Sequence, residues 1–431
     1  MKKKILKFLK RPFVKNVIIL SSGTAAAQLI ALLLTPIITR LYGPYAYGLM
    51  GTFAAVISII GPIASLTFPI AIVLPKREKE AIGIMKLSLL TTIFISLISI
   101  LVLIILNNHI IKYFDLEGIA SFLYLIPIAM FLSGILQITE QWLIRTKQFN
   151  ISAKITFLQA VIVNGGKAGV GFLYPVASVL IIFTALRQGL KALLLILFTR
   201  DIKDLLILLF REKVSYRKLI WKYRDFPLYR APEICINAIS TNLPTVLLTI
   251  FFGPASAGFY SIGKTVLNIP SQLIGKSVGD VFYPRITEAA NSNENLTPLI
   301  LKATLILGAI GFIPFGIVVL FGPVLFSFVF GEEWLIAGEY ARWIALWSYF
   351  SFMNRPSVRA LPVLSAQAFH LIYTIFMLIT RVIVIAIGFF VFSSDIVAVT
   401  LFGTASAFLN IGLILMTLYI SVRFDRLHKR I

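Results

Sequence analysis

The chain has 431 residues, of which 58% are hydrophobic and only 13% are charged. A soluble domain is about half apolar and about a quarter charged, so this composition excludes an ordinary soluble protein. The formal net charge is +22, but no Gly-rich phosphate loop, zinc-ligand spacing or aromatic RNA-binding motif accompanies it, which argues against a nucleic-acid partner. The single cysteine, Cys235, excludes an intrachain disulfide.

Apolar segments long enough to cross a bilayer follow one another along the chain. A spanning helix needs about 20 mostly apolar residues. We predict twelve such segments, at 17–40, 45–74, 82–107, 118–144, 151–173, 176–199, 226–252, 255–283, 299–330, 338–363, 366–392 and 396–421. The segment 338–363 is interrupted by polar residues and a proline, at Asn354, Arg355, Pro356 and Arg359. No cleavable signal peptide is evident, so we expect 17–40 to be the first spanning helix of an all-α polytopic membrane protein.

Lysine and arginine gather in alternate loops. The basic loops are 2–15, 76–86, 145–154, 200–224, Arg285, 355–359 and 423–430. The other loops hold little beyond Arg40 and Lys112. By the positive-inside rule, the basic loops face the cytoplasm. We therefore predict a multi-pass protein of the cytoplasmic (inner) membrane with both termini in the cytoplasm.

An internal repeat divides the chain into two halves. TPIITRLYGPYAYG (35–48) aligns without gaps to TVLLTIFFGPASAG (245–258), with five identities at an offset of 210 residues. The halves, 1–199 and 226–431, hold six spans each and flank a basic segment at 200–225 that predicts an amphipathic helix on the cytoplasmic membrane surface. Because six is even, we expect two six-helix bundles related by a pseudo-two-fold axis along the membrane normal, an arrangement that suits transport between bundles.

Ionisable residues inside the spans indicate where polar chemistry occurs, because a charge in lipid is costly. Cations without an acid nearby on their own helix predict a water-filled cavity for an anionic substrate, unless another helix supplies a partner. These are Arg187, Lys191, Lys264 and Arg381. Weaker substrate-binding candidates are Lys167, Lys276, Arg230 and Asn237. Arg230 and Lys276 can also pair with Glu233 and Asp280, at i,i+3 and i,i+4, or extend to the membrane surface.

The carboxylates counted in the spans are Glu140, Glu233 and Asp280. They are the candidates for coupling transport to a proton or sodium ion. The chain has no GxxxxGK[ST] motif for ATP, so we expect a secondary transporter without cofactor or metal rather than an enzyme.

Four stretches carry a resemblance to a known family. They are TPIITRLYGPYAYG, AIVLPKREKEA (71–81), QWLIRTKQF (141–149) and GFYSIGKTVLNIPSQLIGKSVGDVFYPRITE (258–288). With them the chain resembles, over essentially its whole length, the polysaccharide repeat-unit flippases, the O-antigen and related oligosaccharide translocases of the multidrug/oligosaccharidyl-lipid/polysaccharide flippase superfamily. The most specific matches are in the last stretch, at Lys264, Pro270, Tyr283, Pro284 and Arg285. Members often carry a Leu-Arg-Tyr-Glu-like run before AIVLP, where this chain has Leu66, Thr67, Phe68 and Pro69.

The resemblance implies a polyprenyl-diphosphate-linked oligosaccharide as substrate, membrane lipid around it, alternating access, and polysaccharide polymerase machinery as a candidate partner. Three alternative functions stay open. A multidrug cation exporter of the same superfamily should carry unpaired acids in its spans. A membrane enzyme should have larger outer loops, and the three histidines, His109, His370 and His428, are dispersed. A peptidoglycan-precursor flippase has too similar a substrate to be separated by sequence.

Overall fold

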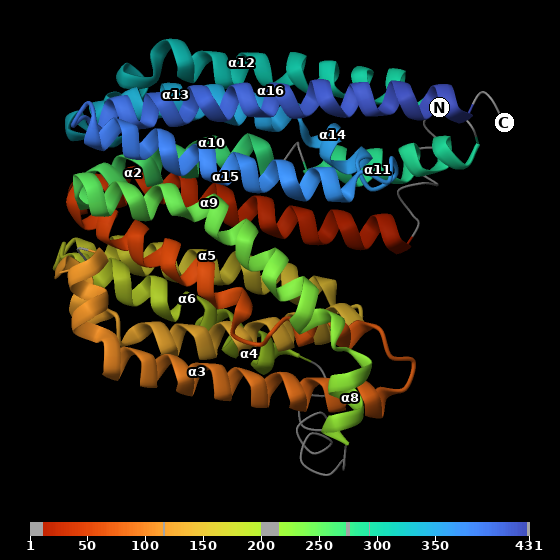
Figure 1. Cartoon of the computed structure of the whole chain (residues 1–431). Helices are drawn as coiled ribbons and strands as arrows, with labels where there is room; N and C mark the ends of the chain where they lie inside the picture. The colour runs from red at the N-terminus through yellow and green to blue at the C-terminus, as the bar shows by residue number, and fades with distance from the viewer. Residues whose placement is uncertain (1–11, 115–116, 200–214, 273–275, 293, 429–431) are drawn as a thin grey trace. The chain divides into compact units, whose positions relative to one another are not determined.

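The computed structural model describes residues 12–114, 117–199, 215–272, 276–292 and 294–428. All regular elements in these ranges are helical, which confirms the all-α fold class (Figure 1). The chain forms two compact units, unit 1 (Met1–Val246) and unit 2 (Leu247–Ile431). The boundary between the units falls inside the helix Ala231–Phe252. The division into six-helix halves at 1–199 and 226–431 stays a prediction.

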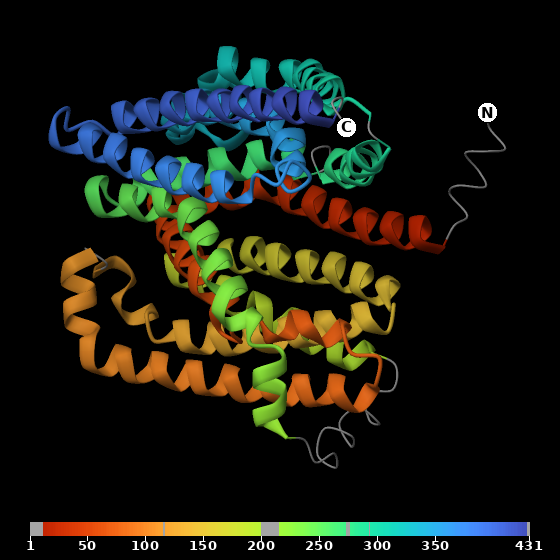
Figure 2. The same ribbon diagram turned by 45° about the vertical axis from the view of Figure 1, so that its right-hand side comes forward.

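Unit 1 is a bundle of long helices with α8 at one end. Its helices are α2 (Pro12–Ile60), α3 (Glu78–Phe114), α4 (Leu125–Arg145), α5 (Phe149–Gly171), α6 (Ala177–Phe198), α8 (Tyr216–Lys222) and most of α9 (Ala231–Phe252). Helix α2 packs against α5 and α6, whereas α4 packs against α3 and α6. Helix α8 lies beside the beginning of α3 (Figure 2). Phe53, Leu123 and Ile181 are buried in the centre of the bundle.

Unit 2 is built around α13. Its helices are α10 (Pro254–Pro270), α11 (Lys276–Asn291), α12 (Leu296–Phe330), α13 (Leu335–Met353), α14 (Arg355–Ala360), α15 (Gln367–Phe390) and α16 (Asp395–His428). Helix α13 contacts α10, α12 and α16, and α15 packs on α16. Large side chains fill the interior, among them the fully buried Tyr260, Tyr340 and Phe402.

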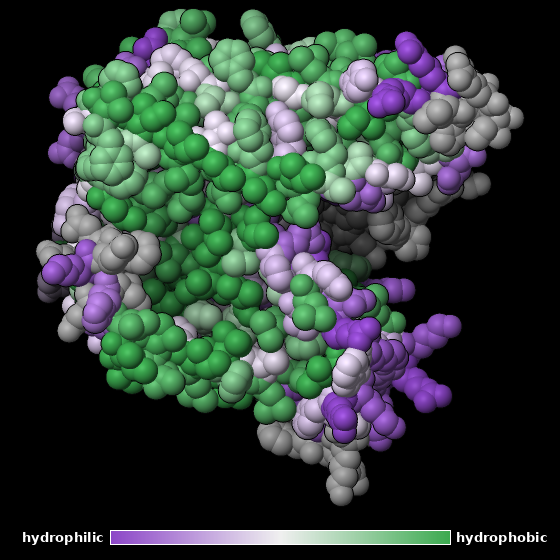
Figure 3. Space-filling view, viewed as in Figure 1, coloured by the Kyte–Doolittle hydropathy of each residue, from purple (hydrophilic) through white to green (hydrophobic). Residues whose placement is uncertain are grey.

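Apolar side chains also cover the outside of the helices. Ile104 on α3 is 67% exposed and Phe328 on α12 is 81% exposed, and hydrophobic residues dominate the face seen in Figure 3. Among the described residues, eight helices are long and apolar enough to span a membrane. One of them, Ser22–Ile63, covers most of the first predicted span, 17–40, and the first part of the second, 45–74. The second span is not one continuous α-helix, because α2 ends at Ile60 and short 3-10 helices follow. Lipid is therefore the solvent for these surfaces, because in water such patches would drive association.

The three remaining predicted spans contain polar residues or breaks. The segment 151–173 corresponds to α5, 255–283 to α10 and α11, and 338–363 to α13 and α14. The predicted interruption at Asn354 is confirmed, because α13 ends at Met353 and α14 begins at Arg355. Asn354 is buried, and its Nδ2 donates to Oδ1 of Asn410 at 3.1 Å. The predicted amphipathic segment lies outside the described residues over 200–214.

The sequence repeat is reproduced in the backbone of each unit. Gly43 breaks α2 with φ 68° and ψ 173°, and Gly253 separates α9 from α10 with φ 87° and ψ 172°. Each glycine is followed by a proline in the first turn of the next helix, a position that suits proline. The repeated threonines before the glycines are all buried, at Thr35, Thr39, Thr245 and Thr249. The glycines are required because this backbone conformation is essentially restricted to glycine.

Candidate functional site

Helices α5 and α6 bring two cations together inside unit 1. The Nζ of Lys167, on α5, donates to Oγ1 of Thr184 at 3.0 Å, and it lies 3.3 Å from Sδ of Met50. Arg187 follows Thr184 by three residues on α6 and is close enough to act on the Lys167 charge. Within the described part of the chain, neither Lys167 nor Arg187 has a carboxylate partner, and the Arg187 side chain is exposed. The pair can therefore accept an anion.

The next cation on α6 is already paired. Nζ of Lys191 lies 2.7 Å from Oε1 of Glu140 on α4, with side-chain exposures of 18% and 34%. The sequence analysis left open whether another helix supplies a partner for Lys191, and in the structure α4 supplies Glu140. This ion pair joins a predicted substrate cation to a predicted coupling acid, and it offsets the cost of holding either charge alone.

In unit 2, aromatic rings surround the guanidinium of Arg381 on α15. It lies 5.4 Å from the ring of Trp347 and 5.7 Å from that of Phe402, and its Nε donates to Oγ of Ser406 at 3.1 Å. Cation–π contacts of this kind stabilise a desolvated arginine. The buried Tyr260 packs edge-on to Phe402. Lys264 follows Tyr260 by one turn on α10 and is partly buried.

The remaining predicted site residues lie on α9 and α11. Nη1 of Arg230 is 2.7 Å from Oε2 of Glu233, which confirms that i,i+3 pair. Asn237, one turn beyond Glu233, is exposed. Lys276 and Asp280 belong to α11, but their side chains lie outside the described residues.

The count of acids in the predicted spans was wrong in one respect, because it missed Glu339. This residue lies in α13, within the predicted segment 338–363, and its Oε2 is 3.1 Å from Nη1 of Arg342. Nε of Arg342 also donates to the backbone oxygen of Val319 at 2.9 Å. The two charges compensate each other, so this pair adds no unpaired charge.

The chain departs from its resembled family at a structural turn. Leu66 and Thr67 both adopt positive φ, at 48° and 58°. The buried Thr67 donates through Oγ1 to the backbone oxygen of Phe226 at 3.0 Å. Phe226 begins the π-helical turn Phe226–Arg230 before α9. The turn therefore uses the Thr67 side chain to connect this segment to the beginning of α9.

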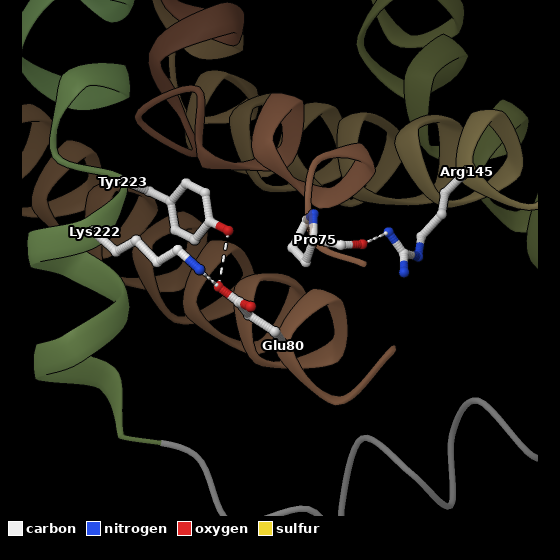
Figure 4. A network of polar contacts seen from close by, with 5 residues as sticks. All are labelled: Pro75, Glu80, Arg145, Lys222 and Tyr223. Carbon is white, nitrogen blue, oxygen red and sulfur yellow. Dashed lines mark hydrogen bonds and ion pairs between the residues drawn. The ribbon is translucent and has the colours of Figure 1, made fainter. Parts of the chain in front are cut away.

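Two of the sequence motifs meet at the basic end of unit 1 (Figure 4). Arg145, from QWLIRTKQF, donates through Nη1 to the backbone oxygens of Ile72 at 3.1 Å and Pro75 at 2.7 Å, both in AIVLPKREKEA. Trp142, one turn before Arg145, is buried in the same cluster as Ile72 and Leu219 of α8. Arg145 thus fixes the loop that leads into α3.

A second polar contact joins this loop region to α8. Glu80 accepts an ion-pair hydrogen bond from Lys222 and a hydrogen bond from Oη of Tyr223 at 2.9 Å (Figure 4). The Glu80 carboxylate raises the pKa of Lys222, and burial raises the pKa of Tyr223. The sequence analysis placed Lys222 among the basic loop residues and gave Glu80 and Tyr223 no role, because nothing local links position 80 to position 222.

The loop and the end of α8 line an open pocket of about 500 Å³. We call it the loop pocket; it is lined by Leu74, Pro75, Lys76, Arg77, Glu80, Lys222 and Tyr223. Hydrophilic side chains gather in this part of unit 1, around α8 and the beginning of α3 (Figure 3). Three cations face one carboxylate, so the lining is electropositive.

These features define a polytopic membrane protein whose described elements are all helical. Among solved structures, the chain is similar to the lipid II flippase MurJ in its inward closed conformation, with TM-score 0.73 and 14% identity over 94% of this chain and 90% of that one. It is also similar to an inward-facing multidrug resistance MATE family transporter of the MOP superfamily, with TM-score 0.64 and 14% identity over 95% of each chain. At these identities the likeness shows the fold.

The family follows from the sequence. Residues 37–338 match the family described as polysaccharide biosynthesis protein, and the chain belongs to it. The inner membrane protein YghQ of Escherichia coli (strain K12) is 35% identical over 96 residues, which are 22% of this chain and 26% of that protein. The match thus spans about a quarter of that relative. The chain is a multi-pass membrane protein with the fold of a transporter.

Proposed function

We propose that the protein flips a polyprenyl-diphosphate-linked oligosaccharide from the cytoplasmic to the outer leaflet by alternating access along a cationic pathway. The observation that carries the proposal is the Lys167–Arg187 pair, two cations on the neighbouring helices α5 and α6 without a carboxylate partner among the described residues. Membership of the polysaccharide biosynthesis family supports a lipid-linked glycan as the anion.

The physics of the substrate agrees with this site. A diphosphate and a glycan cannot enter hydrocarbon without losing the water bound to their charges and hydroxyls. Lys167, Arg187, Lys264 and Arg381 offer replacement contacts, while a polyprenyl tail can remain in lipid. An inside-negative potential favours outward movement of an anion by about 2.3 kcal/mol per charge per 100 mV. Glu140, Glu233 and Asp280 stay the candidates for coupling to a proton or sodium ion, and in this structure Lys191 engages Glu140 and Arg230 engages Glu233.

Complementation tests the proposal. A host that lacks its own repeat-unit flippase would receive wild-type protein, Arg187→Ala, Lys264→Ala or Arg381→Ala at matched expression, with surface polysaccharide as the readout. Lys154→Ala, which removes an exposed cation from α5, is the matched control. We expect wild type and Lys154→Ala to restore polysaccharide and Arg187→Ala to reduce it at least tenfold, because a desolvated anion would lose a charged partner worth about 2–5 kcal/mol.

The other outcomes discriminate among the alternatives. Restoration by all variants would remove the site assignment and keep the flippase. Rescue of a host depleted of its peptidoglycan-precursor flippase, without rescue of surface polysaccharide, would change the substrate. Drug resistance on expression, without either rescue, would identify a multidrug exporter and overturn the proposal.

A further inference from the structure

We propose that the loop pocket is a binding site for a diphosphate group, separate from the cations of the membrane segments. The assignment rests on the proposed function only for the carrier of that group, a lipid at the cytoplasmic leaflet. The evidence for the pocket is its lining. The lining has a loop fixed by Arg145, two cations without an ion pair among the described residues, Lys76 and Arg77, and a third cation, Lys222, that is paired with Glu80.

The first argument is the charge state of the lining. Within the part of the chain that the structure describes, Lys76 and Arg77 are exposed and form no ion pair, although the Arg77 charge acts on Glu80. Glu80 is engaged by Lys222 and Tyr223. Two cations are therefore available to an anion, and a diphosphate carries the matching multiple charge and several acceptor oxygens.

The second argument is preorganisation. Pro75, which is buried, lies between the apolar Leu74 and the two free cations. Its backbone oxygen is held by Arg145 at 2.7 Å (Figure 4). The Arg145 side chain therefore positions Lys76 and Arg77 without lining the pocket itself. A loop fixed before binding loses less conformational entropy when a ligand arrives.

The third argument is location and size. The loop connects a membrane segment to α3, on the side that the positive-inside rule assigns to the cytoplasm. Exposed Leu74 and Trp221 lie on the same loop and on α8, where they suit the membrane interface. A volume of about 500 Å³ admits a diphosphate with part of an attached sugar. Such a pocket can hold the headgroup of a lipid-linked substrate before it enters the membrane pathway.

Binding to the full-length protein in nanodiscs tests the site. The two probes are inorganic pyrophosphate, titrated calorimetrically, and geranylgeranyl diphosphate, incorporated in the bilayer and detected by native mass spectrometry. We expect Lys76→Ala/Arg77→Ala to weaken binding at least tenfold. The control, Lys154→Ala/Lys218→Ala, removes two exposed cations outside the pocket and should change binding less than twofold.

Glu80→Gln tests whether removal of negative charge from the lining strengthens binding of the diphosphate. It removes the only acid in the lining and frees Lys222, so we expect several-fold tighter binding. A structural role for Glu80 alone would give weaker binding or none. Binding of the lipid probe only would identify a membrane headgroup, and binding of both probes a general diphosphate site.

Equal loss in the pocket and control variants would assign binding to the basic surface as a whole and overturn the proposal. Absence of binding by both probes would do the same. Neither result depends on transport, so failure of the loop pocket is distinguishable from failure of the flippase function.

Discussion

The Lys191–Glu140 ion pair shows how one side chain lowers the free-energy cost of burying another charged side chain in this protein. Its atoms are 2.7 Å apart, and Lys191 is only 18% exposed at its side chain. Removal of one partner leaves the other charge without compensation, which costs about 3–5 kcal/mol for a fully buried pair. Because Glu140 is 34% exposed, the loss here should lie below that range.

We therefore expect Lys191→Met and Glu140→Gln to lower the melting temperature in detergent by several degrees each. The double variant should be more stable than the sum of the two losses predicts, because it leaves no uncompensated charge. Thermal unfolding of the four proteins measures this coupling. Additive losses would show that the two side chains do not stabilise each other.

The residue pairs also show which contacts the sequence could predict. Arg230 and Glu233 were predicted correctly because three residues along a helix place two side chains on one face. Lys191 and Glu140 are 51 residues apart, and Lys222 and Glu80 are 142 residues apart. Those pairs depend on how helices pack, which hydrophobic periodicity in a single sequence does not specify.

At the scale of elements, the sequence predicted where membrane-spanning helices lie better than it predicted where a helix is interrupted. Long apolar runs anticipated α3, α12 and α16 because lipid demands them. The Gly-Pro repeat predicted that Gly43 and Gly253 occupy corresponding positions in the two halves. It did not predict that both glycines share one unusual backbone conformation. The candidate substrate-binding cations could be named from the sequence, and their role stays a prediction. The loop pocket could not be named, because it depends on two distant motifs that meet at Arg145.

Gly253→Ala tests the backbone requirement between α9 and α10. An added Cβ would meet nothing within 4 Å, so the effect reports conformation rather than a clash. At φ 87° and ψ 172°, alanine should cost about 1–3 kcal/mol. We expect a lower melting temperature and, if the break positions the helices, weaker complementation.

The matched control is Gly316→Ala on α12. It also meets open space, but it lies inside a helix, where alanine is favoured over glycine by about 1 kcal/mol. We expect this variant to be at least as stable as wild type. Equal behaviour of the two variants would mean that Gly253 is not constrained by its backbone.

At the scale of the whole molecule, the charge distribution makes a prediction about orientation. The basic loops alternate with loops that are nearly free of Lys and Arg, and this asymmetry orients membrane proteins during insertion. The flippase proposal depends on it, because the loop pocket must face the leaflet in which a lipid-linked precursor would be loaded. The proposed direction of transport depends on the same orientation, because an inside-negative potential favours movement of an anion outward.

Cysteine labelling measures the orientation directly, because Cys235 is the single native cysteine and can be replaced by serine. Glu332→Cys, in the turn between α12 and α13, should react with a membrane-impermeant maleimide added outside spheroplasts. Lys218→Cys, on α8, should react only after the membrane is opened. Both positions are exposed, so labelling of both in opened membranes is the control for reactivity. The reverse pattern would place the loop pocket outside the cell, and a site for loading a cytoplasmic precursor could not lie there.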